Sequence, residues 1–173
     1  MTDNSPSVNK LVIIGIGLIG GSLATGLKQR GGCREVIGIA RQQQTCADAV
    51  KLGVVDRAYD NLQAIAGELA AGDVIFISVP TLSVDLVLSQ VRELISPEVT
   101  ITDGASVKGS VQKAVERIYG EIPAQFVPGH PIAGSEKSGV TAANPDLYVN
   151  HRVILTPSAE TGAAHLQRVT AMW

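Results

Sequence analysis

The sequence predicts an α/β fold in which a doubly wound, mostly parallel sheet carries helices on both faces. Short runs rich in valine and isoleucine occur at 11–14, 73–79 and 99–103. Runs of this kind are typical of strands that are buried on both faces of a parallel sheet. Segments with apolar residues at helical spacing separate the strands through the whole chain. This alternation is typical of a doubly wound sheet.

Strands and helices are therefore expected in turn along the chain. Glycines at 53 and 72 are expected to end the second and third helices. The expected strands are 11–14, 35–40, 54–59, 73–79, 99–103, 125–127 and 152–156. The expected helices are 22–27, 45–52, 62–71, 84–95, 107–119 and 163–173.

The bulk properties predict one domain and exclude several classes of protein. The 173 residues suffice for one good core, and we expect a flexible polar tail at 1–9 and a single domain at 10–173. The net charge of −2 and the aromatic content of 3% argue against a nucleic-acid partner. The tail lacks the apolar core of a secretory signal. Cys33 and Cys46 have neither metal-ligand spacing nor a disulfide pattern, so we expect no metal and a cytoplasmic location with reduced thiols.

The stretch 11–27 carries no charge, which raises the alternative of a membrane span. It is shorter than the ~20 residues that usually cross a bilayer, and its glycines suit a sharp turn better than a straight helix. No membrane association is therefore expected.

A glycine motif joins the first strand to the first helix. Gly15, Gly17 and Gly20 form G-x-G-x-x-G within the order strand, turn and helix. In a Rossmann-type dinucleotide site the first glycine makes the tight turn, the second admits the pyrophosphate, and the third lets the helix pack on the strand. The helix start at Leu18 and Ile19 then presents amides to the phosphates. The alternative is a turn with a purely structural role.

The end of the second strand bears on the choice of cofactor. A NAD site usually has an acid about 20 residues after the glycine motif. In this chain that position is Ala40, and Arg41 and Gln42 follow it without a carboxylate. A guanidinium can bind a 2′-phosphate bidentately, so NADP is favoured and NAD is the alternative. Arg41 as an exposed arginine that stacks on adenine is the competing interpretation.

Two further loops follow predicted strands, at 102–109 (TDGASVKG) and 129–136 (GHPIAGSE). Ligands of open α/β sheets lie outside the carboxyl ends of the strands, so both loops are expected to face the cofactor crevice. Together with GIGLIGGS at the start, they resemble the prephenate and arogenate dehydrogenases of tyrosine biosynthesis. The stretch IARQQQTC resembles the NADP-using arogenate members. The resemblance covers essentially the whole chain.

The resemblance implies an oxidative decarboxylation of arogenate or prephenate, with hydride transfer to a nicotinamide. It assigns His130 as the catalytic base and Ser106 as the residue that hydrogen-bonds near the reacting hydroxyl. Glu136 matches an acidic position that lines the substrate site. Val79, Pro80 and Ser106 complete the expected cofactor contacts.

Members of this family also carry a second, all-helical domain that forms a homodimer and completes the substrate pocket. Nothing in the 173 residues corresponds to it, so we expect cofactor binding with little or no turnover by this chain alone. Two other functions stay open: another Rossmann dehydrogenase of the 3-hydroxyacid type, and a non-catalytic NADP-binding regulatory module.

Several residues also have purely structural interpretations. His130 can hydrogen-bond a loop carbonyl, Ser106 can cap the next helix, and Glu136 with Lys137 can be a solvated pair. Lys108 is expected to be a solvated residue at a helix start, and contact with substrate or phosphate is the alternative. The remaining histidines, at positions 151 and 165, receive no role.

Overall fold

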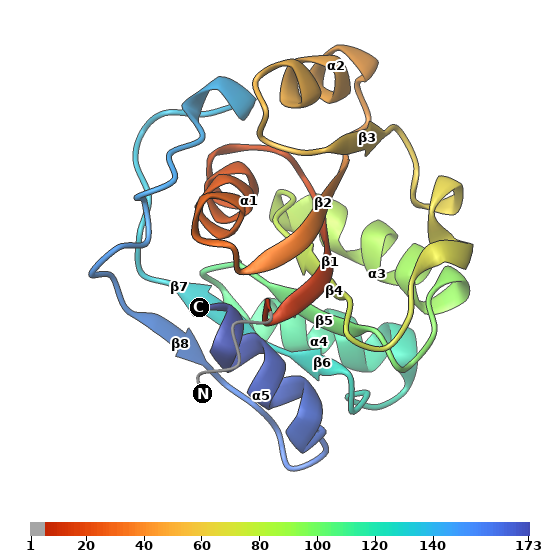
Figure 1. Ribbon diagram of the computed structural model, residues 1–173. Helices are drawn as coiled ribbons and strands as arrows, with labels where there is room; N and C mark the ends of the chain where they lie inside the picture. The colour runs from red at the N-terminus through yellow and green to blue at the C-terminus, as the bar shows by residue number, and fades with distance from the viewer. Residues whose placement is uncertain (1–5) are drawn as a thin grey trace.

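The computed structural model describes residues 6–173 and contains a six-stranded parallel sheet in the order β3–β2–β1–β4–β5–β6 (Figure 1). The chain builds outward from β1 in one direction through β3, and then returns to the other side of β1 with β4. This reversal leaves a crevice at the carboxyl ends of β1 and β4, where α/β proteins bind ligands. The strands are β1 (Val8–Ile14), β2 (Cys33–Ile39), β3 (Arg57–Tyr59), β4 (Val74–Ile77), β5 (Thr100–Asp103) and β6 (Phe126–Val127).

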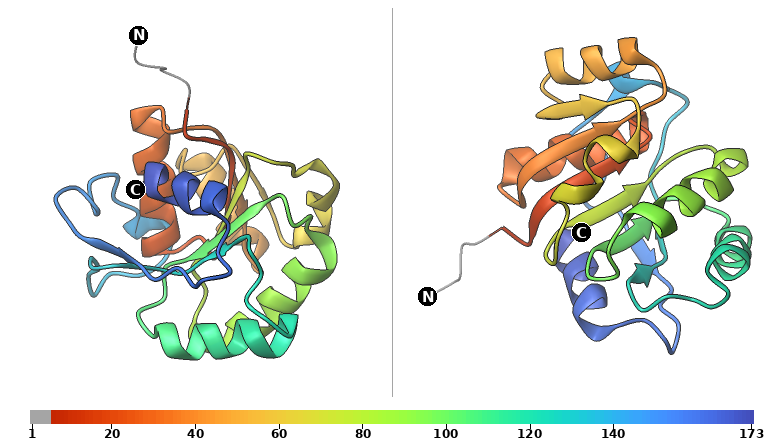
Figure 2. Two further views of the ribbon diagram at one scale, coloured as in Figure 1. Left: turned by 90° about the horizontal axis from the view of Figure 1, so that it is seen from below. Right: turned by 90° about the vertical axis from the view of Figure 1, so that its right-hand side faces the viewer.

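Helices cover both faces of the sheet (Figure 2). On one face α1 and α5 contribute buried residues to the core, and on the other face α3 and α4 do so. Within residues 6–173, no helix combines the length and the apolar character that crossing a bilayer requires. The helices are α1 (Leu18–Arg30), α2 (Gln43–Lys51), α3 (Val84–Leu94), α4 (Lys108–Tyr119) and α5 (Ala163–Met172).

The central strand β1 shows why the sheet is covered on both sides. Val12 and Ile14 belong to the apolar cluster under α3 and α4, whereas Leu11 and Ile13 belong to the cluster under α1. All four are at most 5% exposed. Successive side chains of a strand point to opposite faces, so an unbroken apolar run requires two buried faces. The doubly wound fold class is confirmed.

The sheet begins earlier than the expected boundary between tail and domain. Val8 is fully buried and its amide donates to the carbonyl of Gly32 at 3.2 Å, while the amide of Asn9 donates to Gly72 at 3.1 Å. These contacts place Val8 and Asn9 in β1 rather than in a tail. Ser7, just before β1, also donates its hydroxyl to the carbonyl of Gly32 at 3.1 Å, and residues 1–5 of the predicted tail lie outside the described residues.

The prediction of an α-helix at 62–71 is wrong. Two short 3-10 helices, Leu62–Ala64 and Ala66–Glu68, occupy the segment, and Ile65 between them has φ −123° and ψ 0°. Leu62, Ile65 and Leu69 are buried as the apolar spacing indicates. That spacing reports which side chains face the core, and successive 3-10 turns satisfy it as well as an α-helix does.

The expected third strand at 54–59 is present only as β3, Arg57–Tyr59. Val54 and Val55 precede it, and both are buried in the cluster that α1 covers. Their apolar character therefore reflects packing under a helix rather than pairing in the sheet.

The expected strand at 152–156 forms but does not join the parallel sheet. It is β8 (Val153–Leu155), which pairs antiparallel with β7 (Gly129–Pro131) in a separate two-stranded ribbon. Parallel pairing needs a crossover, usually a helix. Between β7 and β8 the chain forms only the 3-10 turn Val140–Ala142, so it returns antiparallel instead.

Candidate functional site

The glycine loop lies between β1 and α1, beside the end of β4. Gly15 has a φ of +98°, and a Cβ at this position would lie 2.6 Å from the carbonyl oxygen of Ser78. Its amide donates to the carbonyl of Ile39 at 3.0 Å, which ties the loop to the end of β2. The left-handed backbone and the close approach of β4 both require glycine here.

Gly20 and Gly17 face different surroundings. A Cβ on Gly20 would lie 2.5 Å from Cγ2 of Ile13 and 2.6 Å from the carbonyl oxygen of Gly15. Glycine at this position therefore lets α1 pack directly on β1. In contrast, a Cβ on Gly17 would meet no atom within 4 Å, so the space above it is open.

The start of α1 has the properties of a phosphate site. Gly17 is the N-cap, with an extended backbone, and its carbonyl accepts the first helical hydrogen bond, from Gly21 at 2.8 Å. The amides of residues 18–20 consequently have no acceptor within the helix, and they add to the positive end of its dipole. The open space at Gly17 beside these amides fits the pyrophosphate of a dinucleotide.

These two glycines provide a test of the loop. Gly20→Ala is expected to lower the free energy of unfolding by about 1–3 kcal/mol, because its methyl group overpacks the contact between α1 and β1. Gly17→Ala is expected to keep the wild-type stability and to weaken dinucleotide binding at least about tenfold, because the methyl group fills the phosphate space. Denaturant unfolding and calorimetric titration measure the two effects. Equal loss of stability in both variants would contradict this assignment.

Ser78 is a contributor to the loop that the sequence analysis missed. It follows β4 directly, and its hydroxyl donates to the carbonyl oxygen of Gly15 at 2.8 Å. The bond fixes the first glycine of the loop against the end of β4. The sequence did offer a signal for Ser78, because it is a polar residue at the carboxyl end of a buried strand, where α/β proteins place their binding sites.

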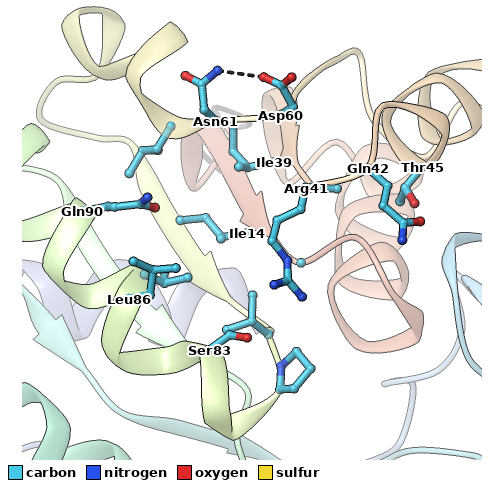
Figure 3. Close-up of a pocket in the computed structure, with 16 residues that line it drawn as sticks. Ile14, Ile39, Arg41, Gln42, Thr45, Asp60, Asn61, Ser83, Leu86 and Gln90 are labelled. Atoms are coloured by element: carbon cyan, nitrogen blue, oxygen red, sulfur yellow. Dashed lines mark hydrogen bonds between the residues drawn. The ribbon is translucent and has the colours of Figure 1, made fainter.

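A cavity of about 310 Å³ opens beside the glycine loop, between the ends of β1, β2 and β4 and the start of α3 (Figure 3). Several of the residues predicted to bind the cofactor line it. These are Gly15, Arg41, Gln42, Val79 and Pro80. The remaining predicted site residues lie outside this cavity. They are Gly17, Leu18, Ile19, Gly20, Ser106, His130 and Glu136.

Asp60 and Asn61 also line the cavity, and no sequence pattern singled them out. They follow β3, whose neighbour is β2, and the amide of Ala40 donates to the carbonyl of Tyr59 at 3.1 Å. This pairing brings a carboxylate beside the position where the sequence lacks one. Asn61 donates its side-chain amide to Asp60 at 2.7 Å (Figure 3).

Of the three residues assigned to catalysis and substrate, Ser106 and His130 lie on segments at the end of β5. His130 is half-buried in β7, Ser106 is exposed in the loop before α4, and Glu136 is exposed beyond β7. The N-cap of α4 is Val107 and makes no side-chain capping bond, so Ser106 does not cap this helix. Among the described residues, no ion pair joins Glu136 to Lys137.

Asp103, at the end of β5, links the segments that carry Ser106 and His130. It is 2% exposed. One carboxylate oxygen accepts from the amide of Ala105 and the other from the amide of Gly129, both at 3.1 Å. Each amide belongs to the residue immediately before Ser106 or His130. The carboxylate thus holds both segments at one edge of the sheet.

Lys108 is not the solvated residue that the sequence analysis expected. Its ammonium group forms an ion pair with Asp103, and its side chain is 18% exposed. Burial lowers the pKa of Lys108, while the neighbouring carboxylate opposes that shift. The pairing depends on the loop folding back over the end of β5, which the sequence does not reveal.

The parallel sheet, the glycine loop at its switch point and the amides at the start of α1 define a Rossmann-type nucleotide-binding domain. Residues 23–173 match the sequence model of a known protein family, the nucleotide-binding domain of prephenate dehydrogenase. The chain belongs to this family.

Solved structures and curated relatives agree with this membership. The chain is 40% identical over 157 residues to a prephenate dehydrogenase of Bacillus subtilis. Prephenate dehydrogenase from A. aeolicus, solved with hydroxyphenyl propionate and NAD+, superposes with a TM-score of 0.88 over 98% of this chain at 32% identity. Synechocystis arogenate dehydrogenase superposes with a TM-score of 0.82 over 94% of the chain, also at 32% identity.

The chain spans only part of each of these proteins. It covers 40% of the Bacillus relative, 57% of the A. aeolicus chain and 55% of the Synechocystis chain. Similarity at this level therefore concerns the nucleotide-binding part of the relatives.

Proposed function

We propose that this chain is the nucleotide-binding half of an NADP-dependent arogenate or prephenate dehydrogenase, which oxidatively decarboxylates its cyclohexadienyl substrate in tyrosine biosynthesis. One observation carries the proposal: a single buried carboxylate, Asp103, holds the segments of Ser106 and His130 at the sheet edge where the glycine loop lies. Membership in the family supports it, because its relatives include prephenate and arogenate dehydrogenases.

In the proposed reaction His130 accepts the proton of the ring hydroxyl, because the nitrogen of a neutral imidazole can act as a general base. Ser106 hydrogen-bonds the same hydroxyl and orients it toward the imidazole. Glu136 lines the substrate side. The nicotinamide, when bound, supplies the acceptor for the hydride from the carbon that bears the hydroxyl. The ring carboxylate leaves as carbon dioxide, and the ring becomes aromatic.

The test is an assay of the full-length protein that carries this domain, with prephenate and arogenate offered separately. We expect absorbance of the reduced nicotinamide to rise with one or both, together with one carbon dioxide for each hydride transferred. A full-length protein that binds NADP and oxidises neither compound would contradict the proposal. Sedimentation of the same protein tests the homodimer that we expect to form through the helical domain.

The preference for NADP rests on Arg41. It is exposed at the cavity, directly beyond the end of β2, and among the described residues it forms no ion pair. Gln42 and Thr45 also line the cavity and can donate hydrogen bonds to phosphate oxygens. Ala40 takes the place of the acid that repels a 2′-phosphate in NAD sites. These features favour a phosphorylated ribose.

Asp60 opposes this preference, and its replacement gives a prediction. Its carboxylate lines the same cavity, so it repels a 2′-phosphate from the neighbouring strand. Asp60→Asn is expected to tighten NADP binding by about two- to fivefold, the range for an exposed charge interaction, and to leave NAD binding unchanged. Asp48→Asn, on α2, is the matched control. Calorimetric titration that finds weaker NADP binding in Asp60→Asn would show that the carboxylate contacts the ribose instead.

A further inference from the structure

We propose that Asp103 is a positioning residue that fixes Ser106 and His130 relative to each other, with Lys108 as its counter-ion. This inference rests on the proposed function, in which His130 and Ser106 meet at the same substrate hydroxyl. Asp103 itself contacts neither substrate nor cofactor in this proposal. Its effect on the reaction passes through the backbone of the two segments.

The side chain of Asp103 hydrogen-bonds to both segments at the end of β5. In the part of the chain that the structure describes, the bond from the amide of Gly129 to Asp103 joins β7 to β5, and no backbone bond does so. β6 pairs with β5 as far as Val127, and β7 begins two residues later and pairs with β8 in a separate ribbon. Sheet register therefore brings the chain to the end of β5, and the side chain of Asp103 holds the first residue of β7 there.

A second, independent observation shows that β7 lies close to the end of β5. A Cβ on Gly129 would lie 2.9 Å from the backbone carbonyl oxygen of Asp103. Such a contact is too short for any side chain, so the sequence must supply glycine immediately before His130. Both the side chain and the backbone carbonyl of Asp103 therefore lie against the first residue of β7.

The hydrogen-bond pattern requires an ionised carboxylate. Both oxygens of Asp103 accept from backbone amides, and one also accepts from the ammonium of Lys108. An ionised carboxylate only accepts, which matches three donors. Asparagine at position 103 has nearly the same shape, but its NH₂ group replaces one carboxylate oxygen. That NH₂ group cannot accept a hydrogen bond, so the bond from the amide that faces it is lost. Asp103→Asn therefore releases one segment while the volume of the side chain is kept.

The chain contains a matched control at the opposite edge of the sheet. Asp73, immediately before β4, is 1% exposed and accepts from the amides of Lys10 and Ala70, both at 2.9 Å. Its second oxygen lies 3.9 Å from the ammonium of Lys10. Asp73→Asn thus removes the same kind of buried, lysine-paired carboxylate at a distance from the site.

The experiment compares Asp103→Asn with Asp73→Asn in the full-length protein. We expect Asp103→Asn to lower kcat by about 10- to 100-fold, because misplacement of reacting groups by about 1 Å costs up to 10²-fold. Its Kd for NADP is expected to stay within about threefold of wild type, since Asp103 does not line the cofactor cavity. Asp73→Asn is expected to leave kcat unchanged even if it lowers stability to a similar degree.

A second readout does not depend on activity. The chain has three histidines, and NMR titration of their ring protons separates His130 from the reporters at 151 and 165. We expect Asp103→Asn to shift the His130 midpoint and Asp73→Asn to leave that midpoint unchanged. If the wild-type protein shows no turnover with either substrate, the proposed dehydrogenase function fails. The NMR titration still tests the positioning role of Asp103 in that case.

The proposal is overturned if Asp103→Asn keeps kcat within about twofold of wild type and leaves the His130 titration unchanged. If Asp103→Asn does not fold, Asp103→Glu decides: it keeps the charge and displaces both oxygens by one methylene. A folded Asp103→Glu with reduced kcat supports the proposal, and one with wild-type kcat overturns it. Unfolding of both variants would make Asp103 a residue for stability alone and would also overturn it.

Discussion

Replacement of Arg41 with alanine is expected to weaken NADP binding by about 10- to 100-fold and to change NAD binding little. The guanidinium is exposed at the cavity and carries no acidic partner among the described residues, so it is available to a phosphate. Hydrogen bonds to charged groups contribute about 1.5–3 kcal/mol, which corresponds to this range of affinity. Calorimetric titration of the wild type and the variant with each cofactor measures the effect.

The control for this prediction is Arg34→Ala. Arg34 is also an exposed arginine on β2, but it stands near the beginning of the strand, far from the carboxyl edge. The same loss of net charge at that position is expected to leave both affinities unchanged. An equal loss of NADP and NAD binding in Arg41→Ala would instead indicate stacking on adenine, and tighter binding of NAD by the wild type would reject the preference for NADP.

Salt dependence separates a phosphate contact from adenine stacking further. An ionic contact with a 2′-phosphate weakens as salt is added, because exposed charges are screened over about 8–10 Å at physiological ionic strength. The difference in affinity between wild type and Arg41→Ala is therefore expected to shrink at high salt. Stacking on adenine is far less sensitive to salt.

The features that the sequence predicted correctly are local ones. Residues 11–14 form a strand because every side chain of the apolar run has a buried face to occupy. Residues 84–94 form a helix because their apolar residues recur on one side. The glycine loop follows from the same logic, since the backbone at Gly15 and the packing at Gly20 leave no room for a side chain. In each case the neighbours along the chain determine the outcome.

The features that the sequence did not reveal depend on which strands become neighbours. Asp60 reaches the cofactor cavity because β3 pairs with β2, and Asp103 meets Gly129 because β7 leaves the sheet at the end of β5. Apolar periodicity does not encode these contacts between distant segments. A carboxylate at the carboxyl end of a buried strand was nevertheless a signal, because that is the edge where α/β proteins place their sites.

Replacement of His130 with glutamine in the full-length protein is expected to lower kcat by about 10²–10⁴-fold, the usual contribution of a general base. The side chain is half-buried on β7, whose backbone is fixed by pairing with β8, so glutamine is accommodated without repacking of the core. His130 does not line the cofactor cavity, and the Kd for NADP is therefore expected to stay near the wild-type value. Steady-state kinetics and calorimetric titration on the same preparation measure both quantities.

The matched control is His151→Gln, because His151 is exposed and its ring hydrogen-bonds only the nearby carbonyl of Val149 at 3.0 Å among the described residues. It is expected to leave turnover unchanged. The combination of lost turnover and retained NADP affinity in His130→Gln separates the two classes of function that the sequence left open. A regulatory module would bind the cofactor through the glycine loop and Arg41, and it would not need His130 as a base. If His130→Gln turns over at the wild-type rate, the proton must leave through another group, and the assignment of this edge of the sheet as the catalytic one fails with it.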